Sequence, residues 1–181
     1  MKTKTIIIIF LIIAILALVI YLNKGSKETT FKEVELPETS NYVGNHTDLK
    51  YIDTVIYLGI NKLNIEGVFV NVLNMNKEVR DNFTKQTGQE LRACIIGEGY
   101  QYAIFVDESM GRDESLVILS HELYHLQQYH SKRLVVLDNG IVNWEGEKMD
   151  VMSLPYNDRP WEKEAFNNQR KLEIELRKVL Y

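Results

Sequence analysis

The sequence predicts a mixed α+β domain behind a single N-terminal membrane-spanning helix. Three observations lead to this fold class: an unbroken run of 17 apolar residues at positions 6–22, later stretches with apolar residues at helical spacing, and short β-branched or aromatic runs separated by turn-forming glycines. The chain left after the run suits one hydrophobic core. We therefore expect a membrane anchor at 1–22, a polar linker at 23–33 and one folded domain at 34–181.

The apolar run is long enough to cross a membrane. As a helix, residues 5–22 would extend about 27 Å, close to the ~30 Å hydrocarbon core of a bilayer. No small-x-small cleavage site follows the run, so the span is expected to stay attached. The very short tail before it favours a cytoplasmic N-terminus and a domain outside the cytoplasm, although Lys24 and Lys27 partly balance Lys2 and Lys4.

The folded part of the chain is acidic. The whole chain has 21 Lys and Arg against 25 Asp and Glu, and without Lys2 and Lys4 the remainder has 19 basic against 25 acidic residues. Such a domain is a poor partner for phosphate backbones, which argues against nucleic acid as a ligand. The single cysteine, Cys94, excludes an internal disulfide and is expected to be a buried strand thiol.

The first half of the domain is expected to contain a helix and a strand. Aliphatic residues recur at helical spacing over 47–63, with Asp48 near the start. Residues 68–73 form a short β-rich run. Residues 77–87 are polar and suit either a loop or a short helix.

A hairpin and a long helix follow. Residues 91–96 and 100–107 are apolar or aromatic runs separated by a Gly-Glu-Gly sequence, which predicts a β-hairpin. The next periodic stretch predicts a helix over about 113–133, with Asp113 or Ser109 as its N-cap.

A second hairpin and a final helix complete the domain. Residues 134–137 and 141–145 flank an Asp-Asn-Gly sequence that favours a tight turn. The last helix is expected to begin near Pro160, a residue suited to the first helical position, and to run toward Leu180.

The long helix carries a motif with metal-binding spacing. Residues 121–125 read His-Glu-Leu-Tyr-His, which matches the HExxH pattern. Because residues at i and i+4 lie on one helix face, both imidazoles can reach one Zn²⁺ at about 2.0 to 2.1 Å, with Glu122 beside them. Helical phase places four leucines on the opposite face, so the His pair is free to face another surface. These leucines are Leu116, Leu119, Leu123 and Leu126.

A catalytic zinc ion needs three protein ligands and an open position. The metzincin pattern would require a Gly and a His where this chain has Gln128 and Ser131, so that class is excluded. His130 is expected to be an exposed residue at the end of the helix.

Two carboxylates on the last helix compete for the third position. Glu162 shares a helix face with Ala165, Phe166 and several leucines, whereas Glu164 shares its face with polar and charged residues. An inward-facing carboxylate is costly unless a metal or a cation holds it. Glu162 is therefore the expected third ligand, and Glu164 is the alternative.

These features resemble the gluzincin metallopeptidases, especially their small members with a zincin-like domain. The resemblance covers about residues 100–170 and rests on the HELYH helix and on a later Tyr-x-x-Arg-Pro-Trp-Glu-x-Glu-Ala stretch, 156–165. In that pattern the Glu three residues before the Ala is the ligand, which maps to Glu162. Phe166 departs from it, because many gluzincins have an Asp there as the partner of the first His. The possible replacements are Asp150, Asp158 and Glu145.

The resemblance implies a zincin-like fold that holds one Zn²⁺ per chain through His121, His125 and Glu162. Glu122 would accept a proton from a zinc-activated water and pass it to the leaving amine. Tyr156 is the candidate donor to the developing oxyanion, with His130 and Arg159 as alternatives.

The leading functional hypothesis is a membrane-anchored zinc metallopeptidase with a peptide or protein substrate. The alternative is a membrane-tethered, catalytically inactive zincin-fold protein that binds a partner. The intact Glu122 favours the enzyme, because an inactive protein has no need of a base. In zincin-like folds the strand before the metal helix edges the cleft, so the resemblance implies that residues 100–107 pair with an extended peptide. From the sequence alone, core packing explains Ile104 and Val106 equally well. Trp144 and Trp161 are expected to pack in the core.

Overall fold

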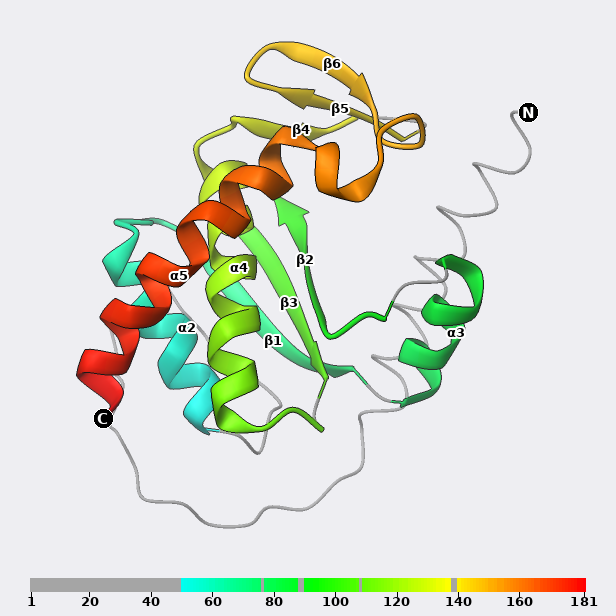
Figure 1. The fold of residues 1–181 in the computed structure, drawn as a ribbon. Helices are drawn as coiled ribbons and strands as arrows, with labels where there is room; N and C mark the ends of the chain where they lie inside the picture. Colours follow the sequence, from blue (N-terminus) through cyan, green and yellow to red (C-terminus); the bar gives the residue numbers. More distant parts are fainter. Residues whose placement is uncertain (1–49, 76, 88–89, 108, 138–139) are drawn as a thin grey trace.

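The computed structural model describes residues 50–75, 77–87, 90–107, 109–137 and 140–181 (Figure 1). The predicted anchor and linker lie outside these residues. Among the residues described, no helix has the length and apolar character needed to cross a membrane. The mixed α+β class is confirmed. The elements are α2 (Lys50–Lys62), β1 (Phe69–Met75), α3 (Lys77–Thr87), β2 (Ala93–Glu98), β3 (Gln101–Asp107), α4 (Arg112–His130), β4 (Leu134–Val136), β5 (Ile141–Trp144), β6 (Glu147–Asp150), the short 3₁₀ helix η2 (Tyr156–Asp158) and α5 (Pro160–Leu180).

The first sheet has three strands in the order β1-β3-β2. β3 pairs with β1 in parallel and with β2 antiparallel, so it is the central strand. The prediction that residues 100–107 edge the cleft is therefore wrong, and within the described residues β2 is the edge strand on that side. β3 suits a central position, because Tyr102, Ile104 and Val106 are buried on one face of the sheet and Phe105 on the other.

The helix α4 lies across one face of this sheet, and α2 and α5 pack beside it (Figure 1). The leucine stripe of α4 faces the main hydrophobic core as predicted, since Leu116, Leu119, Leu123 and Leu126 have no exposed surface. The crossing of α2 over α4 is close at Gly59. A Cβ atom there would lie 2.4 Å from Cδ1 of Leu123, so the small residue permits the contact.

The ends of α4 differ from the prediction. The N-cap is Gly111 and not Asp113 or Ser109, and no side chain caps this end of the helix. The backbone carbonyl of Gly111 accepts a hydrogen bond from the backbone N–H of Ser115. Asp113 lies in the first turn and pairs with Arg177 of α5. The helix ends at His130, earlier than expected, because the chain turns at Lys132, whose φ is 58°.

The second sheet is a meander in the order β4-β5-β6 at the end of the molecule near the start of α5 (Figure 1). The sequence predicted the β4-β5 pair, whose turn residues 138–139 lie outside the described residues, and missed β6. The sequence of β6 has no apolar alternation and its residues are largely exposed. Trp144 and Trp161 pack together between this sheet and α5 with ring centroids 6.3 Å apart, which confirms them as core residues.

Candidate metal centre

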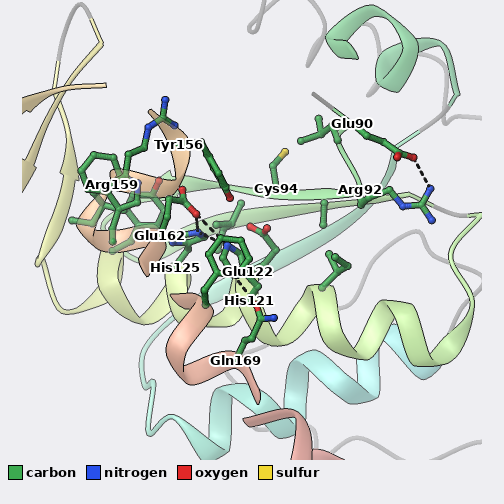
Figure 2. A pocket seen from close by; sticks show the side chains of 18 residues that line it. Glu90, Arg92, Cys94, His121, Glu122, His125, Tyr156, Arg159, Glu162 and Gln169 are labelled. Carbon is green, nitrogen blue, oxygen red and sulfur yellow. Dashed lines mark hydrogen bonds and ion pairs between the residues drawn. The ribbon is translucent and has the colours of Figure 1, made fainter. Parts of the chain in front are cut away.

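Three predicted ligand residues converge from two helices. α4 presents His121 and His125 one turn apart, and α5, which begins at Pro160 as predicted, brings Glu162 to the same point (Figure 2). Oε2 of Glu162 lies 3.2 Å from Nε2 of each histidine, and the two Nε2 atoms are 3.0 Å apart. All three residues are buried.

This arrangement fits one tetrahedral metal ion. Ligand bonds of about 2.0 to 2.1 Å place the ligand atoms of a tetrahedral zinc site about 3.3 Å from one another. The three separations of 3.0 to 3.2 Å form a nearly equilateral triangle of that size. The donor set of two imidazoles and one carboxylate is one of the sets found in catalytic zinc sites.

The charges in the cluster depend on close hydrogen bonding. Burial raises the pKa of Glu162, but hydrogen bonds with His121, His125 and Tyr156 outweigh it and hold that pKa well below its usual range. Burial lowers the pKa of His125, but its hydrogen bond to Glu162 and the charge of Glu122 outweigh burial and raise that pKa to about 9. These contacts favour the ionised form of Glu162 and the protonated form of His125.

Each histidine has an outer partner that the sequence reasoning missed. Nδ1 of His121 lies 3.0 Å from Oε1 of Gln169, and Nδ1 of His125 lies 2.8 Å from Oε1 of Gln128. Helical phase could have identified both glutamines from the sequence. Gln169 lies on the same helix face as Glu162, and Gln128 lies on the same face as the His pair.

The three acidic candidates for the partner of His121 are wrong. Asp150 accepts a hydrogen bond from the backbone of Met152, Asp158 pairs with Lys163, and Glu145 pairs with Arg133. These contacts hold the three carboxylates in turns and on the surface.

Glu122 points into the same cleft (Figure 2). It is buried, and burial raises the pKa of its carboxyl above the usual range, although the two imidazoles and the backbone N–H of Ile95 act in the opposite direction. A carboxyl whose pKa is shifted toward neutrality is suited to exchanging a proton at neutral pH.

Tyr156 lies on η2 beside the three candidate ligands, with its hydroxyl directed toward them (Figure 2). Burial, followed by its hydrogen bond to Glu162, raises the pKa of this phenol, which therefore stays protonated. The guanidinium of Arg159 lies 5.4 Å from the Tyr156 ring and donates to the backbone oxygen of Val151. His130 is half-buried, not exposed, and does not line the cleft.

Two further residues of α5 differ from their predicted settings. Phe166 is 47% exposed and covers His121, with ring centroids 4.5 Å apart, so it lies at the mouth of the site. Glu164 is not a free surface residue. Its carboxylate accepts hydrogen bonds from Gln128 and from Arg133.

The cluster lies in a cleft of about 490 Å³. The edge strand β2 and the residues before it form one wall, α4 forms the floor, and η2 and α5 form the opposite wall. Cys94 lies on a strand as predicted and lines this cleft, but it is half-buried, whereas the sequence predicted a buried thiol. Burial and the nearby charge of Glu122 raise its pKa to about 12, which keeps the thiol protonated.

No protein-family model, no curated protein and no solved structure matches this chain. The function therefore has to be inferred from the chemistry of the site.

Proposed function

We propose that this protein is a zinc-dependent metallopeptidase of the gluzincin type that binds one Zn²⁺ through His121, His125 and Glu162. One observation carries the proposal: three ligand atoms form a triangle with sides of 3.0 to 3.2 Å inside an open cleft that also holds Glu122. An HExxH helix with a third ligand on a later helix is the arrangement that metallopeptidases use.

The ligand set favours a transition metal such as zinc over calcium and magnesium. Calcium and magnesium prefer six or more oxygen ligands, whereas this site offers two nitrogens and one carboxylate. When bound, the ion would polarise a carbonyl group and make a water ligand acidic near neutral pH.

Glu122 is the proposed general base and acid. Its carboxylate would accept the proton of the water that attacks the peptide carbonyl carbon, and the resulting carboxyl would return that proton to the departing amine nitrogen. The raised pKa of Glu122 supports this role, because a carboxylate with a raised pKa is a stronger base than an ordinary glutamate. Tyr156, with its protonated hydroxyl at the same point of the cleft, is the proposed donor to the carbonyl oxygen.

The edge strand β2 is the proposed docking site for an extended peptide. Cys94 and Ile95 of this strand line the cleft opposite Glu162. An edge strand has backbone groups on one side that are not paired with another strand, and these can pair with an added strand. This assignment moves the substrate contact from β3, where the resemblance placed it, to its neighbour.

Metal analysis combined with a peptide-library cleavage assay tests the proposal on the full chain in detergent. We expect one zinc ion per chain and cleavage of part of the library. Glu122→Gln should keep the zinc and lower turnover by about 100-fold or more, since it removes the base and keeps the ligands.

The outcomes separate the two functional hypotheses. A chain without zinc would contradict the metal site itself. Bound zinc with no cleavage of any peptide would favour the alternative, an inactive zincin-fold protein that binds a partner. The membrane anchor at 1–22 is part of the proposal on the sequence alone, and it would place the cleft at the outer face of a membrane.

A further inference from the structure

The side chain of Gln128 connects the candidate metal centre to a second charged group. Gln128 lies on α4, one turn after His125, and is 1% exposed. Its Nε2 donates to the backbone oxygen of Trp161 at 2.9 Å and to Oε2 of Glu164 at 2.9 Å. Its Oε1 lies 2.8 Å from Nδ1 of His125.

These contacts determine which way the amide faces. A carbonyl oxygen and a carboxylate oxygen can only accept hydrogen bonds, so the amide nitrogen has to face Trp161 and Glu164. The amide oxygen is then left for His125, and because that oxygen can only accept, Nδ1 of His125 carries the hydrogen. The lone pair of the neutral ring is therefore on Nε2, the atom that faces Glu162.

Glu164 is the charged member of this arrangement. Its second oxygen, Oε1, accepts a hydrogen bond of 2.8 Å from Arg133, which also pairs with Glu145 after β5. Hydrogen bonds to a carboxylate are about twice as strong as those between neutral groups. Donation by the Gln128 amide to this carboxylate also polarises the amide and makes its oxygen a better acceptor.

We propose that Glu164 is a positioning residue that acts through Gln128 to orient the His125 ring for metal binding. The proposal rests on the proposed zinc site and assigns a role to a carboxylate that helical phase had placed on the solvated face. α5 then contributes to the centre twice, with Glu162 next to the metal position and Glu164 behind the opposite ligand.

A double-mutant cycle on zinc affinity tests this role in the full chain. The variants are Gln128→Met, which keeps the length of the side chain without its hydrogen bonds, Glu164→Ala, and the two combined. Loss of an outer partner of a metal ligand typically costs 10- to 100-fold in affinity, so we expect about that loss for Gln128→Met and a smaller loss for Glu164→Ala. Because Glu164 acts through Gln128, the double variant should bind zinc no more weakly than Gln128→Met.

The matched control is Glu175→Ala. Glu175 lies on the same helix and pairs with Lys62 and Lys178, but has no contact with Gln128. The Glu175→Ala variant should bind zinc with the same affinity as the parent chain. The absorption spectrum of bound Co²⁺ gives a second readout that a loss of stability alone would not move, and it should change in Glu164→Ala but not in Glu175→Ala.

Two results would overturn the inference: parent-like zinc affinity and Co²⁺ spectrum in Glu164→Ala, or losses that multiply in the double variant. If Gln128→Met does not fold, the comparison of Glu164→Ala with Glu175→Ala decides on its own. A parent chain that binds no zinc would instead refute the proposed function and this role with it. A parent that binds zinc but cleaves no peptide leaves the test fully valid.

Discussion

Glu162 is the only anionic ligand of the proposed metal centre, and it comes from a different helix than the two histidines. Glu162→Gln should lower zinc affinity by more than the roughly 10- to 100-fold typical of a lost outer partner, because a neutral amide oxygen is a poorer ligand and the site loses its only ligand charge. Zinc content and a chelator-competition Kd measure the effect. Glu175→Gln, on the same helix, is the control, and full zinc content in Glu162→Gln would show that this carboxylate is not a ligand.

Zinc binding should strengthen as the pH rises. His125, whose pKa is raised to about 9 in the metal-free protein, is protonated at pH 7 and has to lose that proton when Nε2 binds a metal. Glu162, whose pKa is held low, has no proton to lose. The affinity should therefore rise about tenfold per pH unit from pH 7 to about 9 and then level off. Calorimetry in buffers of different ionisation enthalpy counts the released protons, and a constant affinity over this range would contradict the assignment.

The same shift predicts how the stability of the metal-free protein depends on pH. The pKa of His125 is higher in the folded protein than its ordinary value of 6.5. Its contribution to the free energy of unfolding is therefore complete below about pH 6.5 and is lost as the pH rises through about 9.

The comparison of Glu162 with Glu164 shows what helical phase can predict for single residues. Phase placed Glu162 on the inner face of the last helix, and its carboxylate does lie against the His pair. Phase also placed Glu164 on the solvated face, where Gln128 and Arg133 in fact contact it. A periodic pattern describes one helix alone, and it carries no information about side chains that another segment brings alongside.

The contact between α2 and α4 depends on a small residue. Gly59→Ala should destabilise the fold by about 1 to 2 kcal/mol, because overpacking against buried Leu123 costs about 1 to 3 kcal/mol and helix propensity returns at most ~1 kcal/mol. Denaturant unfolding measures the change. Gly111→Ala, where a new Cβ meets nothing within 4 Å, should cost less, about 0.5 kcal/mol, because only the N-cap preference for Gly over Ala is lost. A Gly59→Ala variant as stable as the parent would mean that α2 and α4 can move slightly apart at little cost in free energy.

Elements with a strong period were predictable, and weakly patterned ones were not. The leucines of α4 identify the buried face of that helix, and the proline at the start of α5 identifies where that helix begins. α3 is polar, a composition that suits either a loop or a short helix, and it forms a helix. β6 is largely exposed, so the pattern that normally marks a strand is missing from its sequence.

For the molecule as a whole, the sequence predicts attachment to a membrane through residues 5–22. The full chain should remain in the membrane fraction after alkaline extraction, and a chain without residues 1–22 should not, because the apolar span is long enough to cross the hydrocarbon core. Fractionation followed by N-terminal sequencing tests this. A soluble mature chain that begins near residue 24 would show that the span is a removed signal instead.

The fold class was accessible from the sequence, but the strand order was not. Helical and strand periods alternate along the chain, which is sufficient to predict an α+β domain. The hairpin of β2 and β3 left open which of its strands would pair with β1, because local turn signals do not encode a pairing with a strand far back in the chain. The strand that pairs with β1 becomes the central strand, and the other strand of the hairpin borders the cleft.

The ligands of the proposed centre are far apart along the chain, because the whole β4-β6 meander separates His121 from Glu162, 41 positions later. An ion held by both would close this segment into a loop, as a disulfide does. By the chain-entropy relation for such a cross-link, closure of a loop of that length removes the equivalent of ~4 kcal/mol of conformational freedom from the unfolded chain. The metal would then serve the fold as well as the chemistry, by tying the C-terminal helix to the rest of the domain.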